Sequence, residues 1–401
     1  MPHYLRDVPP AGVLYVLDEA VRHGFSPGDP DWVNLGQGQP ETGPLPGAPE
    51  RITTVELEQG DHEYGPVSGV PELRAKVAEH YNRLYRRGMA SQYTMENVSI
   101  TPGGRLALNR VFTALRDLGI GYRDLDYSFY EDLIGAHLSR LSPVPAATPF
   151  TPAALTELVD RAGIGAFLLS NPCNPTGEVL SGPDLADLVD RARRGGCALV
   201  VDEFYSQFVY QGGPVSVAAH VTDVDADDVL VIDGLTKGFR YPGWRLGWVL
   251  GPRAAIKVLD RAGGGLDGGC SRITQRAALT ALDPAYADQE TAATRAAFAA
   301  KRDLMVEGLR ALGIRVDLPP AGGFYVWGSV ADLPEPLNDA TGFFTAAMGQ
   351  RVITVPGHLF DVDPGRRRRG ERRHASWVRF SYGPSTNVLV EGLARLGALI
   401  G

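Results

Sequence analysis

One lysine of this chain stands where it could act as a nucleophile. Lys237 follows the β-branched run Val229–Asp233 and lies in the segment Gly234–Gly247, among apolar and aromatic neighbours. Burial among such neighbours favours the neutral amine, which is the form that attacks an aldehyde to give an imine. The chain has only three other lysines, all in polar helical stretches where we expect solvated side chains: Lys76, Lys257 and Lys301.

Imine chemistry on a lysine is typical of pyridoxal 5′-phosphate (PLP), and it requires several further groups. A carboxylate must keep the pyridine nitrogen protonated, and donors must hold the ring hydroxyl oxygen and the phosphate. An aromatic ring should cover one face of the cofactor, and an arginine should bind the substrate carboxylate. Residues of these types occur in or directly after strand-like runs: Gly103, Gly104, Arg105, Asn174, Asp202, Tyr205 and Arg379. Each is ordinary when taken alone, since an aspartate can cap a helix, a glycine pair can form a turn and an arginine is usually exposed.

Taken together and in this order, these segments resemble the class I and II aminotransferases, which have PLP fold type I. Three motifs carry most of the resemblance: the lysine segment with Arg245 eight residues after Lys237, the sequence Asp202-Glu203-Phe204-Tyr205, and the turn Asn171-Pro172-Cys173-Asn174-Pro175-Thr176-Gly177. The resemblance implies that Lys237 holds PLP as a Schiff base and that Arg245 binds the phosphate. It also implies that Asp202 pairs with the pyridine nitrogen, and that Tyr205 and Asn174 bond the ring oxygen.

Further segments extend the resemblance over roughly Leu35 to Gly383. Thr101-Pro102-Gly103-Gly104-Arg105 joins a strand to a helix, where free backbone N–H groups favour an anion, and the resemblance implies a phosphate cradle at Gly103, Gly104 and Arg105. Gly36–Pro40 implies that Gly38 lies against the substrate carboxylate. Tyr64–Gly69 implies that Tyr64 reaches the phosphate of a neighbouring subunit, so a homodimer with shared sites is expected. Trp377–Tyr382 implies that Arg379 binds the substrate carboxylate, a role that its planar fork suits.

Two positions near the cofactor depart from the family pattern. Gly234 stands where the family usually has a serine or threonine that bonds the phosphate, although Thr236 keeps a hydroxyl nearby. The segment that should supply the aromatic ring reads Tyr122–Tyr130. Matching Tyr130 to the second family tyrosine puts Tyr127 on the ring face, and Phe129 remains an alternative.

A third departure is the segment Arg366–Arg373, which holds six arginines. Guanidinium groups at this density repel one another and create a local positive field in an acidic chain. One interpretation is a solvated, mobile loop whose charges are screened by salt. The other is a loop that closes over the site and grips a substrate with an additional phosphate or carboxylate.

Elements that would position these residues alternate along the chain. Strands are expected at Val98–Thr101, Ala166–Ser170, Ala198–Asp202, Val229–Asp233 and Leu246–Leu250, with helices between them such as Arg105–Leu115 and Asp184–Arg194. This alternation predicts an α/β fold whose mostly parallel sheet is flanked by helices. After about residue 284 a long Ala/Arg-rich helix leads to a smaller α+β region with strands at Phe324–Trp327, Val352–Val355 and Val378–Tyr382. We expect an N-terminal arm and part of the small domain at 1–48, a large PLP-binding domain at 49–285, and the small domain at 286–401.

Composition excludes several other classes of protein. The formal net charge is −8, which argues against nucleic-acid binding, and no run of about 18 apolar residues predicts a membrane span. The beginning lacks the layout of a signal peptide, and three cysteines, Cys173, Cys197 and Cys270, have no metal-like spacing, so no metal and a reduced cytoplasmic setting are expected.

We therefore expect a PLP-dependent aminotransferase that passes the amino group of an amino acid to a keto acid such as 2-oxoglutarate or pyruvate. The departures and the Arg-, Ala- and Gly-rich composition, typical of a GC-rich bacterial genome, favour a role in specialised metabolism. An alternative with the same fold is a lyase or γ-replacement enzyme similar to the aminocyclopropane-carboxylate synthases. A third, less favoured alternative is the effector-binding module of a transcription regulator. The sequence does not specify the substrate side chain, because loops that vary within one fold contact it.

Overall fold

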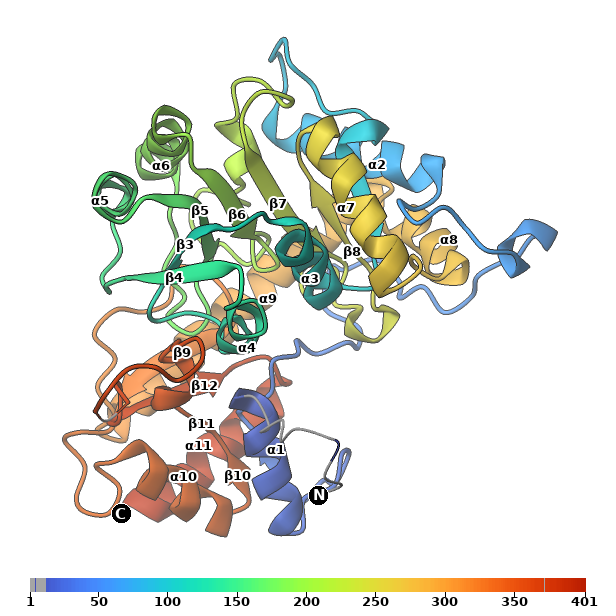
Figure 1. Cartoon of the computed structure of the whole chain (residues 1–401). Coiled ribbons are helices and arrows are strands. Elements are labelled where there is room, and N and C mark those ends of the chain that lie inside the picture. The colour runs from blue at the N-terminus through green and yellow to red at the C-terminus, as the bar shows by residue number, and fades with distance from the viewer. Residues whose placement is uncertain (1–3, 5–11, 371) are drawn as a thin grey trace.

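The structure is a computed structural model that describes residues 4, 12–370 and 372–401. A seven-stranded sheet lies at its centre, in the order β2-β8-β7-β6-β5-β3-β4 (Figure 1). The strands are β2 (Val98–Thr101), β3 (Leu118–Arg123), β4 (Leu141–Ala146), β5 (Ile164–Ser170), β6 (Ala198–Asp202), β7 (Val229–Gly234) and β8 (Gly247–Leu250). The expected α/β class with a mostly parallel sheet is confirmed.

One strand of this sheet runs against the others. β8 is antiparallel to both of its neighbours, β7 and β2, whereas β3 to β7 pair in parallel. Parallel neighbours need a crossover connection, usually a helix, but β7 and β8 are joined directly by the loop that carries Lys237. The loop therefore turns back at the carboxyl end of β7, and Lys237 stays at that edge of the sheet.

Helices cover both faces of the sheet, because alternate residues on each strand point to opposite sides. On one face, Leu168, Val200 and Ile232 pack with α3 (Gly104–Ala114), α4 (Phe129–Gly135) and α7 (Arg253–Leu266). On the other, Leu169, Val201 and Val231 pack with α2 (Pro71–Tyr85), α5 (Pro152–Ala162), α6 (Gly182–Gly195) and α8 (Arg272–Ala281). Strands buried on both sides explain why these runs are apolar throughout.

Two small sheets lie below the large one in Figure 1. β9 (Tyr325–Ser329), β12 (Trp377–Ser381) and β11 (Val355–Pro356) form an antiparallel sheet, and β1 (Val33–Asn34) pairs in parallel with β10 (Val352–Ile353). The expectation of a single strand at Val352–Val355 is wrong. The strand is interrupted at Thr354, and the segments on either side of this residue belong to different sheets. Around these sheets lie α1 (Gly12–Arg22), α10 (Ala340–Gly349) and α11 (Thr386–Ile400).

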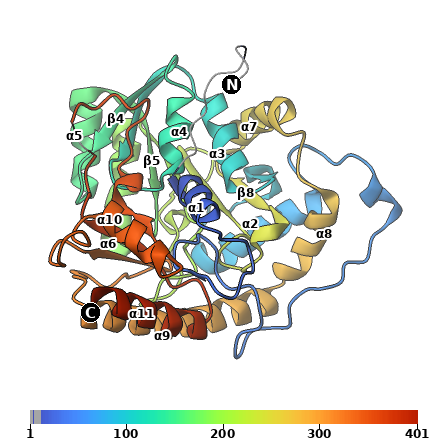
Figure 2. The same cartoon turned by 90° about the horizontal axis from the view of Figure 1, so that it is seen from below.

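The long helix α9 (Pro284–Ala311) connects the large and small parts and runs beside α11 (Figure 2). Its first residue lies next to the boundary expected at residue 285, and the domain boundaries stay a prediction. The segment around the short 3₁₀ helix Gln59–His62 extends away from the body in both views (Figures 1 and 2). Within the described ranges, no helix is long and apolar enough to cross a membrane.

Candidate active site

A cavity of about 540 Å³ opens at the edge of the large sheet where β5, β6 and β7 end. Carboxyl ends of neighbouring parallel strands meet at such an edge, which is where α/β proteins bind ligands. Eleven of the residues expected in the site line this cavity: Gly38, Gly104, Arg105, Tyr127, Asn174, Asp202, Tyr205, Thr236, Lys237, Arg245 and Arg379. Gly103 caps the adjoining helix α3, and Tyr64 is fully exposed and lies outside the cavity of its own chain.

Lys237 extends from the β7–β8 loop into the cavity, where its Nζ donates a hydrogen bond to the carbonyl of Gly38. Burial, followed by the positive charges of Arg379, Arg245 and Arg105, lowers the pKa of Lys237 to about 7. A large fraction of this amine is therefore neutral at physiological pH, as a nucleophile requires.

Asp202 is the last residue of β6 and is almost fully buried. Its Oδ2 accepts a hydrogen bond from the hydroxyl of Tyr130 at 2.9 Å, and its Oδ1 accepts one from the backbone N–H of Phe204 at 3.4 Å. Burial raises the pKa of Asp202 to about 7 despite these two bonds. A cationic N–H group in the cavity would stabilise the ionised carboxylate and bind it strongly.

The start of α3 forms a cradle for an anion. Gly103 is the N-cap, has a positive φ of 84° and provides no side-chain cap, so the first N–H groups of the helix are available to a ligand. A Cβ at Gly103 would lie 2.5 Å from Nη2 of Arg245, and one at Gly104 would lie 2.2 Å from the ring of Phe204. Glycine at 103 therefore suits the positive φ and the close approach to Arg245, and glycine at 104 leaves room for the ring of Phe204.

Two further groups complete this cradle. Arg105 lines the cavity and donates from Nη2 to the hydroxyl of Tyr127 at 3.2 Å. Thr236 also lines the cavity, and its hydroxyl is buried without a hydrogen-bond partner. Such a group is stabilised by an acceptor supplied by a ligand.

Gly234 departs from the family pattern because β7 and β8 approach each other closely. A Cβ at Gly234 would lie 2.5 Å from the carbonyl oxygen of Leu246 and 2.6 Å from Cα of Gly247. Neither contact can be relieved by rotating a side chain, so serine or threonine does not fit here. The unpartnered hydroxyl of Thr236 is the nearest substitute in sequence.

Arg379 enters the cavity from β12 and is almost completely buried. Its Nη1 donates to Oδ1 of Asn174 at 2.9 Å and its Nη2 donates to the carbonyl of Gly36 at 2.7 Å. The guanidinium also lies 4.0 Å from the centre of the Tyr325 ring, and its Nε has no partner. A carboxylate ligand would therefore meet an oriented guanidinium with one donor still available.

The two aromatic candidates occupy different places. Tyr127 lines the cavity, whereas Phe129 is absent from its described wall and lies under the guanidinium of Arg105, 5.1 Å away. The geometry favours Tyr127 as the ring that faces a ligand.

The protein matches the family model for aminotransferase class I and II over residues 30–396. The chain belongs to the class I and II aminotransferases. It is 29% identical to the valine–pyruvate aminotransferase of Mycobacterium tuberculosis over 98% of this chain and 96% of that protein. It is also 29% identical to the aspartate/prephenate aminotransferase of Thermus thermophilus, over 82% of this chain and 81% of that protein. The crystal structure of Thermus thermophilus aspartate aminotransferase with maleate superposes with a TM-score of 0.80 at 25% identity, covering 98% of this chain and 100% of that one.

The sequence assigned no role to some residues of this aminotransferase site. Tyr130 was aligned with a family tyrosine but without a role, and it bonds Asp202. The hydroxyls of Tyr325 and Tyr205 lie 2.9 Å apart. The sequence places Tyr325 only in an apolar strand and gives no sign of this contact. The expectation that Lys301 is solvated is wrong. It is 4% exposed, and its Nζ lies 2.6 Å from Oε1 of Glu41, because one face of α9 is packed against the segment that leads from Gly38.

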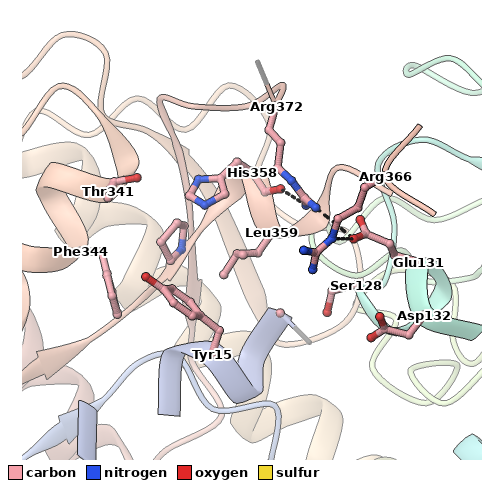
Figure 3. Close-up of a pocket in the computed structure, with 12 residues that line it drawn as sticks. Tyr15, Ser128, Glu131, Asp132, Thr341, Phe344, His358, Leu359, Arg366 and Arg372 are labelled. Atoms are coloured by element: carbon pink, nitrogen blue, oxygen red, sulfur yellow. Dashed lines mark hydrogen bonds and ion pairs between the residues drawn. The ribbon is translucent and has the colours of Figure 1, made fainter. Parts of the chain in front are cut away.

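The arginine-rich segment is bound by carboxylates from other parts of this aminotransferase. Glu131 on α4 accepts from Arg372 at 3.0 Å and from Arg366 at 3.4 Å (Figure 3). Arg368 pairs with Asp361 at 2.5 Å, and Arg373 pairs with Asp124. Arg366 and Arg372 line a second cavity of about 360 Å³, whose described wall shares no residue with that of the first. The expected mutual repulsion is therefore relieved by fixed counter-charges outside the site, whereas Glu371 lies outside the described residues.

Proposed function

We propose that this aminotransferase carries PLP on Lys237 and passes the amino group of an α-amino acid to an α-keto acid. Membership of the family supports the reaction, and the single observation that carries the site is the position of Lys237. Its amine has a pKa lowered to about 7 and shares one cavity with Asp202, the start of α3 and Arg379.

The residues of the cavity fit PLP. The buried, unpartnered hydroxyl of Thr236, the glycine cradle at the start of α3 and the guanidinium of Arg245 suit a phosphate group. Asp202, buried at the end of β6, suits a protonated ring nitrogen. When bound, PLP withdraws electrons from the bonds at the substrate Cα, and this lowers the barrier to removal of the Cα proton.

Each protein group then has a defined task. Arg379 binds the substrate carboxylate with its available donor, and the Gly36–Gly38 backbone limits where that carboxylate can lie. The freed amine of Lys237 would accept the Cα proton as general base. Asp202 keeps the ring nitrogen protonated, Tyr205 and Asn174 hold the ring oxygen, and Tyr127 covers one face.

We infer a homodimer with shared sites. Tyr64 is fully exposed and follows the 3₁₀ helix Gln59–His62, where the chain extends from the body (Figure 2). A tyrosine in such a position is available to a second copy of the chain, where its hydroxyl would donate to the cofactor phosphate. Pyruvate is the amino acceptor that a relative's name suggests, because one relative is a valine–pyruvate aminotransferase.

A half-reaction tests the proposal. The PLP-loaded enzyme is mixed with single amino acids without any keto acid, and the cofactor is followed by its absorbance and by chromatography. We expect one equivalent of pyridoxamine phosphate per site, followed by arrest until a keto acid is added. Continuous turnover without a keto acid would contradict transamination and favour elimination or replacement.

A further inference from the structure

Helix α1 presents apolar side chains to the active-site cavity. Val13, Leu14, Val16 and Leu17 all line it, together with Ile353 of β10. The spacing of these four residues places them along one face of the helix. Leu14 remains 47% exposed, so apolar surface in the cavity wall is left uncovered by the protein. Covering this surface with an apolar group of a ligand is favourable, because the apolar surfaces of the helix and of the ligand are both removed from water.

The charged groups of the cavity wall all have a task in the proposed function. Lys237, Asp202 and Arg245 face the cofactor, and Arg379 faces the substrate carboxylate. Arg105 is bound to the hydroxyl of Tyr127 at the phosphate cradle. In the part of the wall that the structure describes, the remaining polar residues are uncharged: Asn34, Gln37, Gln39, Tyr127, Ser170, Asn174, Tyr205, Thr236 and Tyr325. No unused cation or anion remains there to pair with a charged substrate side chain.

The arginines of the Arg366–Arg373 segment do not supply that charge. Figure 3 shows Tyr15 of α1 pointing into the second cavity, where Arg366 and Arg372 are bound to Glu131. Tyr15 lines only this cavity, whereas its neighbours Leu14 and Val16 line the active site. Helix α1 therefore separates the substrate cavity from the arginine-rich segment.

We propose that the amino donor has an aliphatic, uncharged side chain that packs against Val13, Leu14 and Leu17 of α1. This inference rests on the proposed transamination and on the same site. A branched chain of the size of leucine gains from burying its methyl groups against the helix. A second carboxylate or an ammonium group on the substrate side chain would instead lose its hydration without gaining an ion partner, and this desolvation is costly.

Donor selectivity gives the first test. Half-reaction kcat/KM values are measured for leucine, valine, methionine, alanine, glutamate, aspartate and lysine. We expect leucine to exceed alanine by about 10-fold or more, and the charged amino acids to fall below leucine by at least as much. Glutamate or aspartate reacting as well as leucine would overturn the inference and leave transamination intact. Reaction with none of them would contradict the proposed function itself.

A charge placed on α1 gives the second test. In Leu14→Arg, we expect the ratio of leucine to glutamate kcat/KM to fall about 10-fold or more, because the new guanidinium attracts a second carboxylate. Val21→Arg is the matched control, since Val21 is on the same helix, is 57% exposed and lies outside the described cavity wall.

Binding provides a readout that is independent of turnover. Calorimetry with the PLP-loaded enzyme should give tighter binding of 4-methylpentanoate than of glutarate, and Leu14→Arg should reverse that order while Val21→Arg keeps it. If a folded Leu14→Arg protein still binds 4-methylpentanoate more tightly than glutarate, α1 does not contribute to recognition of the substrate side chain.

Discussion

Nη1 of Arg379 donates a hydrogen bond of 2.9 Å to Oδ1 of Asn174. Arg379 belongs to β12 of the small antiparallel sheet, and Asn174 belongs to the turn after β5 of the large sheet. The bond therefore joins the two sheets across the cavity and orients the guanidinium before any ligand binds. Pre-orientation of this kind reduces the entropy that is lost when a substrate carboxylate binds.

The first prediction concerns Arg379. Arg379→Lys keeps the positive charge but loses the planar fork that contacts Asn174 and Gly36 together. We expect KM for the amino acid to rise about 10-fold or more, with a smaller change in kcat, since the oriented guanidinium donor to the substrate carboxylate is lost. Initial rates over a range of amino-acid concentrations measure both constants. Arg395→Lys at an exposed ion pair is the control, and an unchanged KM in Arg379→Lys would exclude this residue as the carboxylate ligand.

A second prediction concerns Asp202. Asp202→Asn keeps the shape of the side chain and its bond to Tyr130 but removes the charge that would hold the ring nitrogen protonated. We expect PLP to remain bound and kcat to fall roughly 100-fold or more, the usual scale for loss of a proton-controlling group. Absorbance measures the bound cofactor and the half-reaction measures the rate. Turnover close to that of the unchanged enzyme would rule out this role.

The lowered pKa of Lys237 predicts how cofactor uptake depends on pH. Burial and the charges of three arginines lower this pKa to about 7, so the neutral amine dominates above that pH. We expect the rate of PLP uptake by the cofactor-free enzyme to rise as the pH increases through about 7 and then to level off. Stopped-flow absorbance gives this rate, and N-acetyl-lysine serves as the reference amine, whose reaction should rise until about pH 10. A profile that follows the reference amine would show that the site does not lower the pKa.

The arginine-rich segment gives a prediction about stability instead of catalysis. Glu131 accepts from Arg366, Arg372 and the backbone of Asp363, and its side chain is only 13% exposed. Glu131→Gln should lower the free energy of unfolding by about 1 kcal/mol and leave the amino-acid KM unchanged at low salt. Urea denaturation and initial rates measure the two effects. Glu391→Gln, at a more exposed pair with Arg395, should change stability by less than about 0.5 kcal/mol. A large rise in KM for Glu131→Gln would instead assign the segment to substrate binding.

The part of the site that the sequence predicts is the part that lies at strand ends. Asp202 ends one strand, and Asn174 and Lys237 follow its two neighbours. The rule that carboxyl ends of parallel strands meet at one edge brings the three residues together. The alternation of strands and helices predicts the large sheet for the same reason. Local patterns and the family motifs therefore suffice where the geometry of the sheet fixes the positions.

The remainder depends on contacts between segments that are far apart in the chain. The partner of Arg372, Glu131, is 241 positions away, and the partner of Lys301, Glu41, is 260 positions away, so both pairs are invisible to reasoning from neighbours. The packing of α1 against the cavity is equally hard to predict from the sequence, because the apolar face of a helix does not specify which surface it covers. The breaking of Val352–Val355 into two strands follows from pairing with two different sheets, which the run itself does not encode.

The central claim is that Lys237 carries PLP in this aminotransferase, and chemical trapping tests it most directly. The enzyme is incubated with PLP, reduced with borohydride, digested and analysed by mass spectrometry. We predict one pyridoxyl group per chain on the peptide that contains Lys237, and none on that peptide in Lys237→Ala. A pyridoxyl group found instead on Lys76, Lys257 or Lys301, or no stable adduct on the unchanged enzyme, would contradict the account.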